Sequence, residues 1–141
     1  MEFLMSRESR LMAGITLITV PTIQYGGLFL LRSLMDTGSG YMDNPLRQNL
    51  FRAGHAHAGV IVVLSLTCQL LVDGAALSMA LAWFVRIGVP LAAILMPIGF
   101  FLALPAPTDT VPSRAIALVY AGALLLAASV LTLGVGLIRR I

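Results

Sequence analysis

The sequence predicts an all-α integral membrane protein, a single transmembrane domain built as a four-helix bundle. Hydrophobic residues make up 59% of the 141 residues and charged residues 11%, whereas soluble globular domains carry about 25% charged residues. The mean hydropathy is +0.97. About 20 apolar residues cross a hydrocarbon core roughly 30 Å thick, so a chain of this length has room for about four spans.

The charged residues fit the same class of protein. All nine basic residues are arginines, and most of them flank apolar runs, where they anchor helix ends in lipid headgroups. The pI near 9.8 therefore predicts no nucleic-acid partner. The sequence has no phosphate-binding glycine loop, no paired carboxylates in an apolar run and no nucleophile with a nearby base. The sequence therefore shows no residues for hydrolase or kinase catalysis, and whether the chain is an enzyme stays open.

The first predicted helix covers residues 11–32 and contains Pro21, which removes one backbone hydrogen bond and predicts a kink. We expect a retained helix and not a cleaved signal, because the apolar run is long and no small-residue cleavage site follows it. A loop rich in Gly, Ser and Asp leads to the second predicted helix, residues 45–72. Asn44 and Pro45 predict its start, as an N-cap and a proline at the first helical position.

The third predicted helix covers residues 75–104. Asp73 contributes to the turn before it, and we expect its carboxylate to be solvated. Arg86 interrupts the apolar pattern and leaves two interpretations open. Either one long tilted helix lets the Arg86 side chain reach the surface, or an interfacial segment precedes a span that begins near Gly88. We favour the long helix, bent at its two prolines.

The fourth predicted helix, residues 113–138, is rich in alanine and glycine. Ala117 with Ala121, and Ala123 with Ala127, repeat at four-residue spacing and predict close packing against a neighbouring helix.

An even number of spans places both termini on one side of the membrane. Four arginines near the termini make this the cytoplasmic side of a bacterial inner membrane, although four others lie on the opposite side. The terminal set is Arg7, Arg10, Arg139 and Arg140, and the opposite set is Arg32, Arg47, Arg52 and Arg114.

Both histidines of the chain, His55 and His57, lie inside the second predicted helix. Ionisable side chains within a membrane are costly and are candidates for a functional site. At about 100° per residue the two point about 200° apart, so one helix cannot direct both at a single metal ion. One imidazole is enough for an axial haem ligand. We therefore treat both as candidate ligands of haem b, or secondarily of another metal, with the second axial ligand supplied by another subunit, by Met96 or by none.

Arg52 lies one turn before His55 on roughly the same side of the helix. A cation there suits a haem propionate, a lipid phosphate or a quinone headgroup, but it also suits a simple anchor for the helix end. Small residues surround the histidines and either admit a flat cofactor or let another helix touch; they are Gly54, Ala56, Ala58 and Gly59.

The run RAGHAHAGVIVVLSL around these residues resembles a signature of small four-helix membrane proteins of bacteria, and this resemblance covers most of the chain. More distantly, an Arg followed by His and Gly in an apolar helix resembles the second helix of haem-copper oxidase and nitric oxide reductase main subunits. There the helix-2 histidine is an axial ligand of the low-spin haem. The resemblance implies His55 or His57 as that ligand and Arg52 as a propionate partner. The later helices with the other histidines are missing, so oxygen or nitric oxide reduction by this chain alone is not implied.

Three functions follow from these residues. The first hypothesis is a haem-binding bundle for electron transfer, as a homodimer or as part of a larger respiratory-type complex. The second is a non-catalytic accessory or assembly subunit, in which the histidines form hydrogen bonds between helices. The third is a lipid or quinone binder that uses Arg52 and the histidines as headgroup contacts.

Overall fold

The computed structural model describes residues 5–141, and in this part of the chain it is all-helical with four long helices. The long helices are α1 (Arg7–Met35), α2 (Pro45–Leu71), α3 (Met79–Ala103) and α4 (Ile116–Ile138). A short 3-10 turn, η1 (Val72–Gly74), extends the end of α2. Each long helix is long and apolar enough to cross a membrane.

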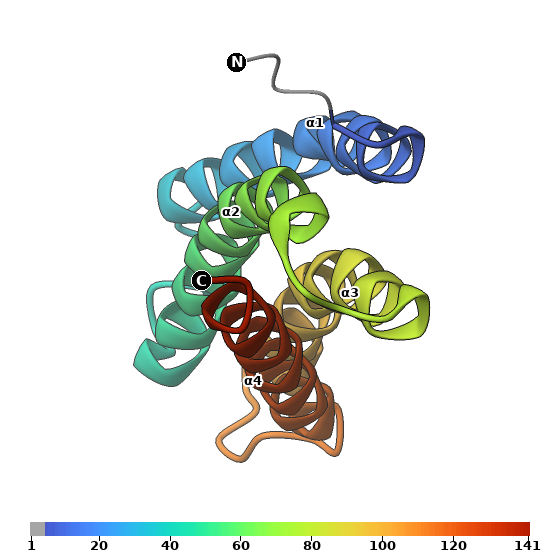
Figure 1. The fold of residues 1–141 in the computed structure, drawn as a ribbon. Coiled ribbons are helices and arrows are strands. Elements are labelled where there is room, and N and C mark those ends of the chain that lie inside the picture. Colours follow the sequence, from blue (N-terminus) through green and yellow to red (C-terminus); the bar gives the residue numbers. More distant parts are fainter. Residues whose placement is uncertain (1–4) are drawn as a thin grey trace.

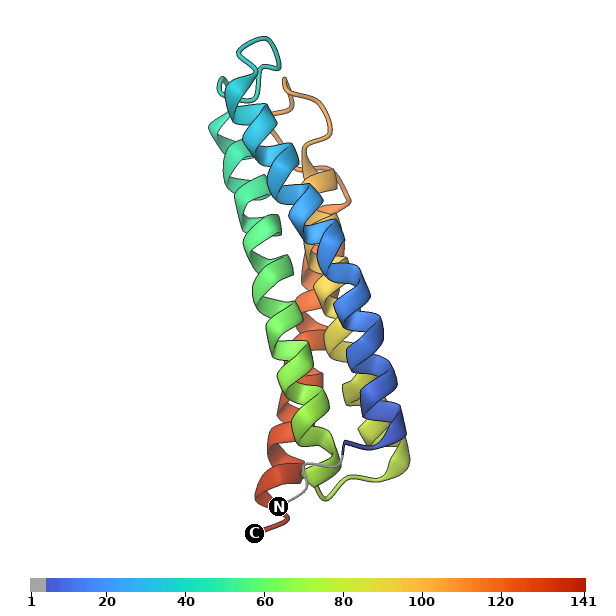
Figure 2. The same cartoon turned by 90° about the horizontal axis from the view of Figure 1, so that it is seen from above.

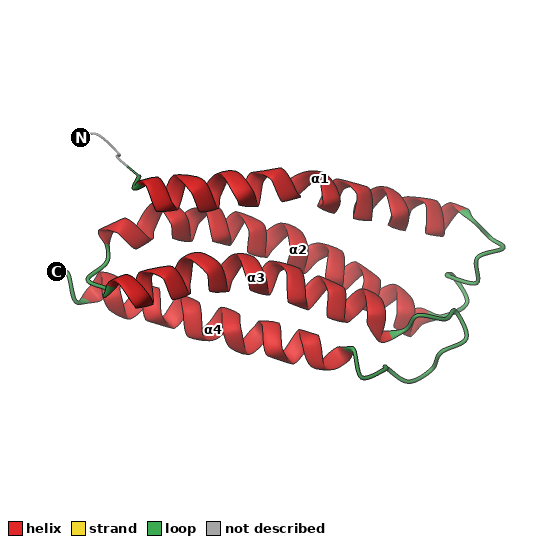
Figure 3. Ribbon diagram, turned by 90° about the vertical axis from the view of Figure 1, so that its right-hand side faces the viewer, coloured by secondary structure: helices red, strands yellow, loops and turns green. Residues whose placement is uncertain are grey.

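The four helices form an elongated bundle in which successive helices run in opposite directions (Figures 2 and 3). The start of α1 and the end of α4 lie at one end of the bundle, and the α1–α2 and α3–α4 loops lie at the other (Figure 3). Seen along its axis, α1 and α4 lie on opposite sides of the α2–α3 pair (Figure 1). Within its most apolar stretch, α3 is 50% buried and α1 only 11%. The third helix is therefore the centre of the bundle, and α1 is attached mainly to α2.

The helix starts are set by side-chain caps. Asn44 accepts a hydrogen bond from the Arg47 amide over 3.0 Å and Pro45 is the first residue of α2, which confirms the predicted start. Ser6 caps α1 by accepting from the Ser9 amide, so this helix begins before the apolar run, at Arg7 instead of residue 11.

The third helix is one continuous helix, but its predicted start at residue 75 is wrong. Ser78 caps α3 by accepting from the Leu81 amide, and the helix begins at Met79. The apolar residues before it pack against the end of α4, where the Ala76 amide donates to the Gly136 carbonyl over 2.8 Å. Apolar composition alone could not distinguish this connection from another helical turn.

Close packing of α3 against α4 does rely on small residues, but not on the predicted alanines. Ala117, Ala121, Ala123 and Ala127 are all exposed. The buried small residues of α4 lie on another face, at Gly122, Ser129 and Gly136. A Cβ added to Gly122 would lie 2.5 Å from Met96 Cγ, so a larger side chain would push the helices apart. The four-residue spacing therefore selected the wrong face of α4, because small residues occur all around this helix and the buried ones repeat every seven residues.

Candidate functional site

The two histidines lie on opposite sides of α2, as the angle between them predicts. The His55 ring packs against α1, where a Cβ on Gly27 would lie 3.3 Å from Nε2 and one on Gly26 would lie 3.6 Å from Nδ1. His57 faces α3, and its ring centroid lies 5.2 Å from that of Phe100. The two imidazoles therefore belong to two different helix interfaces, and a single ion cannot be bound by both.

Hydrogen bonding distinguishes the two rings further. His57 Nδ1 lies 2.7 Å from the Ala53 carbonyl oxygen, and because a carbonyl only accepts, Nδ1 carries the proton. Of the two imidazoles, only that of His57 has a hydrogen-bond partner in residues 5–141. His55 is half-buried between two helices with its hydrogen-bonding capacity unused by the described part of the chain.

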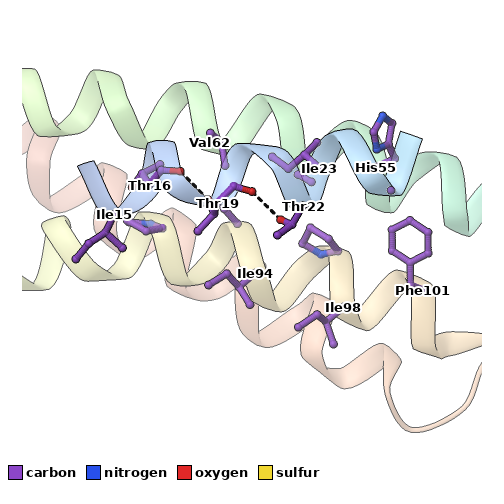
Figure 4. Close-up of a pocket in the computed structure, with 15 residues that line it drawn as sticks. Ile15, Thr16, Thr19, Thr22, Ile23, His55, Val62, Ile94, Ile98 and Phe101 are labelled. Atoms are coloured by element: carbon purple, nitrogen blue, oxygen red, sulfur yellow. Dashed lines mark hydrogen bonds between the residues drawn. The ribbon is translucent and has the colours of Figure 1, made fainter. Parts of the chain in front are cut away.

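His55 lines a cavity of about 250 Å³ between α1, α2 and α3. Its floor consists of buried residues of α2 and α3, namely Ala58, Val62, Ala93 and Pro97. Its rim consists of exposed residues of α1 and α3, namely Ile15, Thr22, Ile94 and Ile98. Figure 4 shows the lining side chains gathered between these helices. The cavity therefore opens sideways between α1 and α3, on the long side of the bundle, because α1 makes few contacts with α3.

A row of threonines forms the α1 wall of this cavity (Figure 4). Thr16 donates its hydroxyl proton to the Met12 carbonyl over 2.8 Å. Thr19 and Thr22 donate to the Thr16 and Thr19 carbonyls, each over 2.7 Å. The hydroxyl hydrogens are thus engaged with the backbone of their own helix, while the oxygens stay on the cavity wall.

The small residues near the histidines have separate roles. Gly54 lets another helix touch, because a Cβ there would lie 3.0 Å from Phe100 Cβ and 3.2 Å from the Phe101 ring. Ala58 lines the cavity floor. Contact with another helix is therefore realised at Gly54, whereas room for a flat cofactor beside Ala58 stays a prediction.

Arg52 does not line the His55 cavity. It is exposed and donates to the Gln48 side-chain oxygen over 3.1 Å, on its own helix. Residues 5–141 contain no group of three or more His, Cys, Asp or Glu side chains that could hold a metal ion. The structure therefore gives no support to the metal prediction. Haem ligation by His55 or His57, with Arg52 as a propionate partner, stays a prediction that an absorption spectrum of the oxidised and reduced protein would test.

A polar cluster lies near the start of α1, and the sequence did not predict it. Arg86 forms an ion pair with Asp73 over 2.6 Å, and its Nε donates to Ser9 Oγ over 3.2 Å. The Ser6 amide donates to the second Asp73 oxygen over 2.9 Å. We call these residues, Ser6, Ser9, Asp73 and Arg86, the α1 clasp, because they join the start of α1 to the α2–α3 connection.

Two predictions about this cluster are therefore wrong. Arg86 does not reach the surface but is 7% exposed, and Asp73 is bound in an ion pair instead of being freely solvated. A buried arginine within an apolar helix requires a partner. The sequence feature that could have predicted this pair is the presence of opposite charges, Asp73 and Arg86, 13 residues apart on either side of one turn.

A second missed residue is Gln69, which is fully buried. Pro90 has no amide hydrogen and cannot donate to the Arg86 carbonyl four residues before it. Gln69 Nε2 donates to that same carbonyl over 3.0 Å. A side chain of α2 thus supplies the hydrogen bond that the proline removes from α3.

Comparison of the chain with family models, with curated proteins and with solved structures found no match in any of the three. Both resemblances drawn from the run around His55 therefore stay predictions.

Proposed function

We propose that this chain is an integral membrane protein that binds a neutral, ring-containing lipid of the quinone class in the cavity between α1, α2 and α3. The observation that carries the proposal is His55, an imidazole at the wall of an apolar cavity with no hydrogen-bond partner in residues 5–141. A polar group that faces an apolar environment without a hydrogen-bond partner costs free energy. A bound molecule with a polar head would supply the partner that the described chain does not.

The depth of the cavity supports a ligand that arrives from within the bilayer. The 27 residues of α2 extend about 40 Å at 1.5 Å per residue. Centred on a hydrocarbon core roughly 30 Å thick, this helix would carry His55, about 15 Å from its start, about 10 Å inside the core. The opening between α1 and α3 then faces acyl chains, so an apolar molecule could enter without crossing water.

The lining of the cavity selects for an uncharged head. None of the 15 lining residues is Asp, Glu, Lys or Arg. A phosphate group at this depth would be unpaired, and burying an unpaired charge is far more costly than burying a neutral polar group. Arg52, the cation predicted to receive a headgroup, lies outside the cavity. The cavity volume of 250 Å³ is slightly below the range of about 300–1,000 Å³ for sites that enclose drug-sized molecules. A cavity of this size suits a single substituted ring.

We also propose that the chain is inserted in a bacterial inner membrane with both termini in the cytoplasm. The start of α1 and the end of α4 lie at the same end of the bundle (Figure 3). The opposite end carries the acidic residues Asp36, Asp43 and Asp109 beside its arginines, and arginine-rich segments are retained on the cytoplasmic side. A reporter fused to the C-terminus that is active only in the periplasm should be inactive.

The binding proposal is tested with the full chain in detergent by native mass spectrometry. The probe is an equimolar mixture of a decyl-substituted benzoquinone and its quinol, and binding of either form supports the proposal. We expect one bound probe molecule. His55→Leu should bind it about tenfold more weakly, the effect of losing one hydrogen bond. The matched variant His57→Leu should bind normally, because His57 does not line the cavity.

A second pair of variants tests the location. Ile94 lies on the cavity rim and is 47% exposed, whereas Ile18 of α1 is 78% exposed and does not line the cavity. Ile94→Trp should obstruct the opening and abolish binding, and Ile18→Trp should leave it unchanged. Equal binding by all four variants, or no binding by the wild-type protein, would refute the proposed function.

A further inference from the structure

We infer that the cavity selects a lipid that donates a hydrogen bond, a phenol, quinol or alcohol, over the corresponding ketone, quinone or ether. This inference rests on the proposed function and adds the chemical class of the head. It follows from the balance of donors and acceptors on the cavity wall.

The donors are few. Each threonine hydroxyl on the wall already donates to a backbone carbonyl of α1, over 2.8 Å for Thr16 and 2.7 Å for Thr19 and Thr22. To donate to a ligand, a hydroxyl would have to give up this bond in an apolar environment. A neutral histidine has one N–H group. His55 is therefore the side chain that offers the cavity a free donor.

The acceptors are more numerous. Each threonine oxygen that donates keeps acceptor lone pairs, and the second ring nitrogen of His55 accepts as well. The floor adds a backbone group: Pro97 cannot donate to the carbonyl of Ala93, and both residues line the cavity. The wall thus has several acceptors for one free donor.

A hydroxyl group matches this wall and a carbonyl or ether oxygen does not. A hydroxyl can donate to a threonine oxygen and accept from the His55 N–H at the same time. A carbonyl or ether can only accept, so it would leave the remaining acceptor lone pairs of the threonine oxygens unused. A protonated amine would also donate, but no acidic residue lines the cavity to balance its charge.

The test compares two molecules that differ only in the donor, para-decylphenol and para-decylanisole. They compete for the full wild-type chain in detergent, and native mass spectrometry measures both complexes in one spectrum. We expect the phenol to bind about tenfold more tightly, which corresponds to one additional hydrogen bond. Thr19→Val keeps the shape of the side chain but removes its oxygen, so it should reduce the preference several-fold by weakening the phenol alone.

Thr67→Val is the matched control. The Thr67 hydroxyl donates to the Val63 carbonyl in the same manner, but Thr67 is exposed on α2 and does not line the cavity. Its substitution should leave the preference unchanged. Equal binding of phenol and anisole overturns the inference and leaves the proposed function standing. Binding of neither probe, together with no binding of the quinone and quinol mixture, overturns both.

Discussion

The ion pair of the α1 clasp should contribute more to the free energy of unfolding than the exposed charges of the described chain do. The perturbation is Arg86→Met, which removes the guanidinium but keeps a long apolar side chain. The Arg86 side chain is 8% exposed and that of Asp73 is 23% exposed. Breaking a buried ion pair by removing one partner costs about 3–5 kcal/mol. Because Asp73 retains some contact with solvent, we expect the lower end, about 3 kcal/mol.

A double-mutant cycle with Asp73→Asn isolates the pair. If the two side chains stabilise each other, Arg86→Met should cost less once Asp73 is neutral. We expect a coupling free energy of about 2 kcal/mol, within the range for residues in direct contact. Arg10→Met is the matched control, because Arg10 is an exposed arginine of α1, and it should change the free energy of unfolding by less than about 0.5 kcal/mol.

The assay is unfolding of the purified protein from mild detergent into SDS, followed by circular dichroism. Hydrogen exchange gives the location: in Arg86→Met the amides at the start of α1 should exchange faster, while those of α3 and α4 keep their protection. Additive effects of the two substitutions, or an Arg10→Met loss as large as that of Arg86→Met, would refute the reasoning.

Two further predictions concern the packing of α3. Gln69→Leu should lower the free energy of unfolding by about 1–3 kcal/mol, since it leaves the Arg86 carbonyl without a donor. In a Pro90→Ala background the residue 90 amide can donate to that carbonyl, so Gln69→Leu should then cost less. An equal cost in both backgrounds would contradict this account. Gly88→Ala should cost about 1–3 kcal/mol by overpacking, because its new methyl would meet the Ser129 side chain. Gly14→Ala, at a position with open space, should be neutral or stabilise by up to about 1 kcal/mol, and equal losses at the two glycines would contradict the packing argument. All of these are read from SDS unfolding curves.

Residues close together in the sequence were enough to predict where several helices lie and which way their side chains point. Asn44 followed by Pro45 fixed the start of α2, since capping depends on the few residues beside the helix end. The opposite orientation of His55 and His57 followed from the helical repeat alone. Apolar run lengths located the four helices of the described chain, within a few residues at most ends.

Only the tertiary structure decided which residues meet. In the sequence Asp73 is a charge at a helix end and Arg86 a charge inside an apolar run, and they pair because the α2–α3 connection brings α3 back beside the end of α2. The packing face of α4 depends on how α3 lies against it, so the exposed alanines could not be excluded beforehand. The cavity has the same origin. Its floor, rim and His55 come from three helices, and periodicity shows which residues share one helix face but not which faces are brought together.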